Sequence, residues 1–109
     1  MNNRVLRLDT SNSDKTIMHP DWVVGDDATR TGIFKSPHSI VFHSQTESVI
    51  VADRDNYRLV VLDASTGALK GHLHDWCPTS PTTAPWGMRV DGDRLVVAVC
   101  DSPETGSNQ

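Results

Sequence analysis

A histidine and an arginine sixteen residues apart are the side chains best suited to chemistry in this sequence. His38 lies between a proline and a serine, and Arg54 lies between two aspartates. A neutral imidazole is a common ligand of zinc, and a guanidinium binds a planar carboxylate through two parallel hydrogen bonds. Metal binding by His38 and anion binding by Arg54 are therefore the chemical roles to consider, and the two residues alone leave a structural role open for each.

Other residues could bind ligands but have simpler explanations. His72 and His74 lie two apart on a predicted strand, so both imidazoles would share one face and could hold a metal, although without a third ligand they are better explained as surface histidines. Cys77 and Cys100 match no zinc-ligand spacing and form either an isolated disulfide or two thiols. The tryptophans could stack on a ligand, but large aromatics more often fill the junctions between structural units: Trp22, Trp76 and Trp86.

Composition and charge exclude several classes of function. Ten basic and fourteen acidic residues give a net charge of −4, and no basic cluster is present, so nucleic acid is not an expected partner. No apolar run approaches the roughly 20 residues of a transmembrane helix, and the first residues lack the apolar core of a signal peptide. No membrane segment and no targeting signal is therefore expected in this stretch. The sequence also lacks a glycine-rich phosphate loop and a nucleophile elbow.

The elements that position these residues are predicted to be strands. Apolar residues come in short β-branched runs separated by glycine, proline, aspartate, asparagine and serine, which is typical of an all-β chain. Turns are predicted at 65–67 and 91–93, and connectors at 21–27 and 78–85. The predicted strands are 4–8, 39–42, 48–52, 58–63, 68–73, 87–90 and 94–100.

Internal repeats indicate how the strands are organised. Residues 2–11 repeat at 56–65 with the pattern Asn-x-Arg-apolar-apolar-x-Leu-Asp-x-Ser, and 37–40 match 85–88 more weakly. A unit of about 50 residues with four short strands predicts one blade of a β-propeller. Because closed propellers have 4 to 8 blades, the 109 residues are expected to be a fragment of about two to two and a half blades of a larger ring.

The residues around His38 and Arg54 resemble a known repeat. Pro37-His38-Ser39, followed by Val51-Ala52-Asp53-Arg54-Asp55-Asn56-Tyr57-Arg58, is similar to an NHL repeat. Within the NHL family it is most similar to the peptidyl-α-hydroxyglycine α-amidating lyase domain, in which a histidine and an arginine have the same separation. The resemblance implies a six-bladed ring, with the end of one blade and a connector in 1–33, a complete blade in 34–75, and a connector with the start of a divergent blade in 76–109.

The resemblance also implies an activity. Members of that lyase family split a peptidyl-α-hydroxyglycine into the peptide amide and glyoxylate, using zinc held by histidines from three blades. His38 would be one zinc ligand and Arg54 would bind the substrate carboxylate, whereas the other ligands and the catalytic base would lie outside this chain. The isolated fragment is expected to be inactive. The alternative is a non-catalytic NHL propeller that acts as a protein-interaction platform.

Further expectations follow from the same resemblance. The substrate would be a peptide in the secretory pathway or outside the cell. A copper monooxygenase domain would be a partner, either fused to this protein or separate. Calcium is a second candidate ion besides zinc. Asp53, Asn56 and Arg58 are expected to hold the blade together rather than react. In the divergent blade, Trp86 takes the position of His38, and Val99-Cys100 take the positions of Asp53-Arg54, so that blade supplies no matching ligand.

Overall fold

The computed structural model describes residues 3–14, 16–25, 34–73 and 83–101 of the 109. Within this part the chain forms strands and one short 3-10 helix. In chain order they are β1 (Val5–Asp9), β2 (His19–Val24), β3 (Pro37–His43), β4 (Ser48–Asp53), η1 (Arg54–Asn56), β5 (Arg58–Asp63), β6 (Leu69–Leu73), β7 (Thr83–Asp91) and β8 (Arg94–Asp101).

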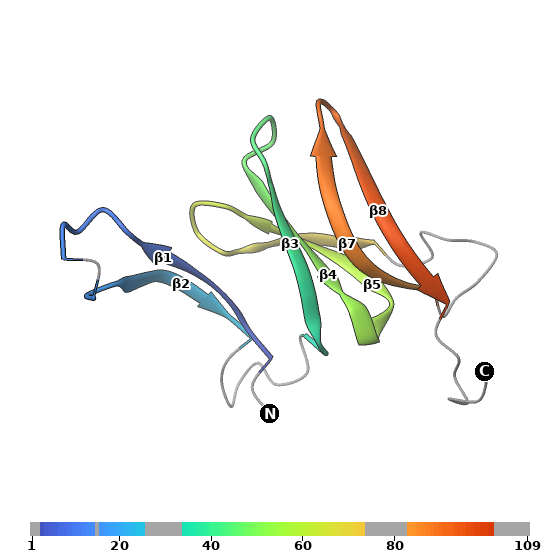
Figure 1. Ribbon diagram of the computed structural model, residues 1–109, viewed down its shortest axis with the longest axis horizontal. Coiled ribbons are helices and arrows are strands. Elements are labelled where there is room, and N and C mark those ends of the chain that lie inside the picture. The colour runs from blue at the N-terminus through green and yellow to red at the C-terminus, as the bar shows by residue number, and fades with distance from the viewer. Residues whose placement is uncertain (1–2, 15, 26–33, 74–82, 102–109) are drawn as a thin grey trace.

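The strands form three antiparallel sheets. Strands β3, β4, β5 and β6 pair in sequence order as a four-stranded meander, while β1 pairs with β2 and β7 pairs with β8. The four-stranded sheet lies between the two hairpins (Figure 1). The all-β prediction is therefore confirmed, and the architecture is that of a β-propeller segment with one four-stranded blade between two half-blades.

One strand was not predicted. The sequence suggests a connector over 21–27, but β2 occupies His19–Val24. The region contains Pro20 and only three adjacent apolar residues, so it shows no alternation of apolar and polar positions. Its only hydrogen-bonded neighbour among the described strands is β1, and proline is tolerated on such an edge. Pairing with β1, and not local sequence pattern, defines this strand.

The C-terminal end of the predicted connector over 78–85 is also wrong, because residues 83–85 belong to a strand. Strand β7 begins at Thr83, four residues before the predicted start, and includes Pro85. Thr83 and Pro85 are both buried, so their burial against the neighbouring sheet extends the strand despite the proline. The remaining predicted strands agree with β1, β3, β4, β5, β6 and β8 to within two residues at each end.

The repeat of residues 2–11 at 56–65 is explained by two equivalent turns. At the end of β1, Asp9 Oδ1 accepts hydrogen bonds from Ser11 N at 2.9 Å and Ser11 Oγ at 2.7 Å. At the end of β5, Asp63 Oδ1 accepts from the backbone nitrogens of Ser65 at 2.8 Å and Thr66 at 3.0 Å. These hydrogen bonds lower the pKa of both aspartates. The Leu-Asp-x-Ser motif is thus a strand followed by an Asx turn in both blades.

The hydrophobic core lies between the first hairpin and the four-stranded sheet. Side chains from β1, β4 and β5 are buried together with Phe34, which precedes β3. Partly buried residues of β2 and β4 pack against them. Repeat units of this kind bury their apolar faces against neighbours. The core residues are Val5, Phe34, Val51, Val60 and Leu62, with Trp22, Val24 and Val49 at the border.

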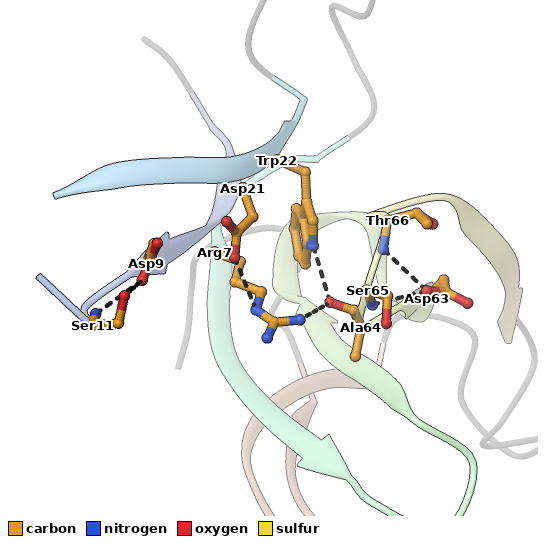
Figure 2. Close-up of polar contacts among 9 residues, drawn as sticks. All are labelled: Arg7, Asp9, Ser11, Asp21, Trp22, Asp63, Ala64, Ser65 and Thr66. Atoms are coloured by element: carbon orange, nitrogen blue, oxygen red, sulfur yellow. Dashed lines mark hydrogen bonds and ion pairs between the residues drawn. The ribbon is translucent and has the colours of Figure 1, made fainter.

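One backbone carbonyl of the four-stranded sheet accepts two hydrogen bonds from side chains of the first hairpin. Ala64 O, in the turn after β5, accepts a hydrogen bond from Arg7 Nη1 at 2.6 Å and another from Trp22 Nε1 at 3.0 Å. Arg7 also forms an ion pair with Asp21, with Nε 3.3 Å from Oδ2 (Figure 2). Gly67 lies directly against the indole of Trp22, where a Cβ atom would be 2.6 Å from Cδ2. Trp22 is therefore a packing residue at the junction between sheets.

Candidate ligand-binding site

The turn between β4 and β5 is built around one buried carboxylate. Asp53 is fully buried, and its Oδ1 accepts a hydrogen bond from the backbone nitrogen of Lys35 at 2.7 Å. Its Oδ2 accepts from Asn56 Nδ2 and from Arg58 Nε, each at 2.8 Å. The charge of Asp53 is thus compensated by the Arg58 guanidinium. The expectation that these residues hold the blade together is confirmed.

The same turn fixes the backbone that carries Arg54. The backbone nitrogen of Arg54 donates to Ser36 O at 3.3 Å, and that of Asp55 donates to Lys35 O at 2.9 Å. Ser36 and Tyr57 adopt positive φ angles of 62° and 54°, which bring the chain sharply into β3 and out of η1. The segment before β3 and the helix η1 are therefore joined by main-chain hydrogen bonds. These hydrogen bonds fix the position of the Arg54 backbone.

His38 occupies an irregular position at the start of β3. The β3–β4 pairing passes from Pro37 opposite Asp53 to Ser39 opposite Ala52, so β3 contains one extra residue at this point. A β-bulge of this kind changes the direction of the side chain that it carries. His38 lies within this bulge and is exposed.

Strand β7 has the same irregularity at the same place. The pairing with β8 passes from Pro85 opposite Val99 to Met88 opposite Val97, which again leaves one extra residue in the first strand. Trp86 directly follows the proline, as the histidine does in β3. Val99 takes the ladder position that the buried aspartate has in the preceding blade. The weaker repeat suggested by the sequence is therefore real.

The side chains at these two bulges meet Arg54. The rings of His38 and Trp86 have centroids 4.6 Å apart with planes at 66°, which is an edge-to-face arrangement. Arg54 Cζ lies 4.7 Å from the Trp86 ring centroid, within the range of a cation–π contact. The structure thus brings together His38 and Arg54, the two residues that the sequence singled out, through an indole from the next blade.

Hydrogen bonding leaves several polar groups of this cluster available. Arg54 Nε donates to Asp55 Oδ1 at 3.0 Å, and Ser36 Oγ donates to Asp55 Oδ2 at 2.8 Å. Among the described residues, no hydrogen-bond partner is present for the terminal nitrogens of Arg54 or for the ring nitrogens of His38. The aspartate thus orients Arg54 through Nε while the terminal N–H groups remain available for a carboxylate.

The acid titration of Asp55 tests this arrangement. The Arg54 hydrogen bond, with a smaller contribution from Ser36, lowers the pKa of Asp55 below its ordinary value of 3.8. Ionised Asp55 therefore stabilises the fold fully above pH 4, and this contribution is lost as the pH falls through the lower folded-state pKa. We expect a carboxyl ¹³C NMR titration to give a midpoint below 3.8, and Ser36→Ala to raise it partly. A midpoint at or above 3.8 would contradict the contact with Arg54.

The other candidates of the sequence do not join this cluster. His72 is exposed on β6 and Cys100 is exposed on β8, whereas His74, Trp76 and Cys77 lie outside the described residues. No group of three histidine, cysteine, aspartate or glutamate side chains able to hold a metal occurs in residues 3–14, 16–25, 34–73 and 83–101. Trp86 is the residue whose role was missed, although its place in the weaker repeat put it at the histidine position of the next blade.

The fold and this arrangement define the class of protein. A four-stranded antiparallel meander, a proline-led first strand and an Asp-Arg-Asp-Asn turn closed on a buried aspartate describe a β-propeller segment of the NHL type. No family model matches the chain, and no solved structure matches it. In the part of the chain that the structure describes, no helix is long and apolar enough to cross a bilayer.

Comparison with curated proteins supports this class. The chain is 34% identical over 98 residues to NHL repeat-containing protein 3 of Homo sapiens, and 35% identical over 98 residues to the protein of that name from Mus musculus. Each match covers 90% of this chain and 26% of the relative, so the chain spans about a quarter of the length of these relatives. These relatives support the NHL-repeat family and not, by themselves, the narrower resemblance to an amidating lyase.

Proposed function

We propose that the protein is a lyase that cleaves a peptidyl-α-hydroxyglycine into a peptide amide and glyoxylate. The observation that supports this proposal is the meeting of His38 and Arg54 at one exposed indole, with the ring nitrogens of His38 and the terminal nitrogens of Arg54 unpartnered within the described residues. The proposal includes peptide substrates in the secretory pathway or outside the cell, and a copper monooxygenase domain that is fused or separate.

Arg54 is assigned the substrate carboxylate. Its Nε is held by Asp55 and its planar group lies over Trp86, while its side chain keeps 28% of its surface exposed. A guanidinium that is already oriented loses less conformational freedom on binding than a mobile one. Arg54 would therefore hold the carboxyl end of the substrate beside His38, with two parallel hydrogen bonds fixing its orientation.

His38 is assigned to a zinc ion. Its imidazole is exposed and without a hydrogen-bond partner in the described part of the chain, which suits a metal ligand. One imidazole does not complete a zinc site, so the other ligands would come from blades outside the described residues. Bound zinc would supply Lewis-acid polarisation of the substrate hydroxyl.

The test is glyoxylate release from a peptidyl-α-hydroxyglycine by the full-length protein supplied with zinc. We expect Arg54→Gln to raise KM about 10- to 100-fold with a smaller change in kcat, because the lost contact exists in the bound substrate as well as in the transition state. His38→Gln should abolish zinc-dependent release. The matched control is His43→Gln at the other end of β3, where Nδ1 lies 2.8 Å from Thr46 Oγ1, and it should leave release unchanged.

A second candidate function is supported by the adjacent blade. Trp86 and Val99 take the positions of the histidine and the aspartate there, so that blade offers an aromatic surface in place of a ligand. This favours an interaction platform in which the cluster binds a partner without chemistry. Absence of glyoxylate release from a folded, zinc-loaded protein would reject the lyase and leave the platform.

A further inference from the structure

We infer that Trp86 is a specificity-determining residue, and that the cluster of His38, Arg54 and Trp86 binds a carboxylate whose neighbouring group is aromatic or broadly apolar. The inference rests on the proposed role of Arg54 as the carboxylate-binding residue, and it does not depend on lyase activity or on zinc. The cluster forms between two blades, because Trp86 comes from β7 and the other two residues from β3 and η1.

Charge in the cluster favours an anion. The carboxylate of Asp53 is already occupied by Arg58, and both oxygens of Asp55 are occupied, one by Arg54 and the other by Ser36. The acceptors near Arg54 are therefore used within the protein, whereas its terminal N–H donors are not used among the described residues. A ligand that fits must bring acceptors, and a carboxylate matches two parallel guanidinium donors.

The indole favours an apolar group next to that carboxylate. Trp86 contacts both Arg54 and His38 and still keeps 37% of its surface exposed. An exposed tryptophan held in place by two neighbours offers a rigid apolar surface at little further cost in conformational entropy. Because the guanidinium centre is only 4.7 Å from the ring centroid, a ligand bound to Arg54 places its adjacent group at the indole.

Trp22 shows what a purely structural tryptophan looks like in this chain. Its indole nitrogen donates to Ala64 O, and its ring packs against Gly67 and the core. Trp86, in contrast, lies at a bulge, contacts the two residues selected from the sequence, and is more exposed. The two tryptophans therefore have separable roles.

The experiment measures binding without zinc by NMR chemical-shift titration of the full-length protein. The probes are N-acetyl-L-phenylalanine, N-acetyl-L-alanine and N-acetyl-L-phenylalanine amide. We expect the phenylalanine acid to bind about five- to tenfold more tightly than the alanine acid, and the amide to bind more weakly than the acid. Trp86→Leu should remove the preference for phenylalanine while keeping the preference for acid over amide, and Arg54→Gln should remove the preference for the acid.

The control is Phe42→Leu, which removes an exposed aromatic on β3 about 13 Å along the strand from His38 and should change neither ratio. Equal weakening of both acids by Trp86→Leu would overturn the inference and leave Trp86 as a positioning residue for Arg54. Failure of all three probes to bind would overturn it as well. Glyoxylate release is measured separately, so a protein that binds these acids without cleaving a hydroxyglycine rejects the proposed lyase and retains the inference.

Discussion

Asp53→Ala is expected to lower the free energy of unfolding by about 3–5 kcal/mol, because it leaves the largely buried guanidinium of Arg58 without its ion-pair partner. Asp53 is completely buried, and the Arg58 side chain that it neutralises is only 17% exposed. The change also removes the acceptors used by the Lys35 backbone nitrogen and by Asn56. Urea unfolding followed by circular dichroism would measure the difference. Asp53→Asn should cost nearly as much stability, because the amide NH₂ would replace one acceptor oxygen and face an N–H donor.

An exposed ion pair provides the matched control. Asp21→Ala removes the partner of Arg7, but both side chains are about half exposed, so the expected loss is at most about 1 kcal/mol. The double variant of Asp53 and Arg58 to alanine should lose less than the sum of the two single variants, because the second change removes the unpaired charge. Strict additivity of the two changes would show that the buried pair does not exist.

Gly67→Ala is the second change with a large expected effect, about 2–5 kcal/mol of lost stability. Gly67 has a φ angle of +77°, which costs a residue with a Cβ about 1–2 kcal/mol. A Cβ at this position would also lie 2.6 Å from Trp22 Cδ2, inside van der Waals contact, and overpacking of this kind costs about 1–3 kcal/mol. The same urea measurement would give the loss.

Two other glycines separate these causes. Gly92 has a φ angle of +60°, and a methyl group added there would meet nothing within 4 Å, so Gly92→Ala should show the backbone cost alone. Gly71 has neither restriction, and Gly71→Ala should leave stability unchanged or raise it by up to about 1 kcal/mol. If Gly67→Ala costs no more than Gly92→Ala, the close packing of the first hairpin on the four-stranded sheet is wrong.

The sequence predicted the strands whose own pattern defines them. Strand β5 matches its prediction at both ends, because its apolar run at 59–62 is followed directly by the turn aspartate Asp63. Strand β2 and the start of β7 were missed, since their extent depends on pairing and burial against neighbouring strands. Local propensity carries no record of such tertiary contacts.

Two residues of the candidate cluster, His38 and Arg54, were selected from the sequence, but their assembly with Trp86 was not predicted. His38 and Arg54 could be selected because residue type and spacing are visible in one blade. Their contact with Trp86 depends on how two blades pack, which spacing within one blade does not give. The weaker repeat contained the necessary signal, because equivalent positions on adjacent blades of a propeller lie side by side.

The extra residue that follows the proline in β3 and in β7 has a consequence for how these blades evolve. Each bulge carries its own side chain, His38 in one blade and Trp86 in the next, and the register of the ladder shifts by one residue there. Both side chains are exposed, so an exchange at either position replaces no side chain of the core. These two positions can therefore change during evolution independently of the core that holds the sheets together.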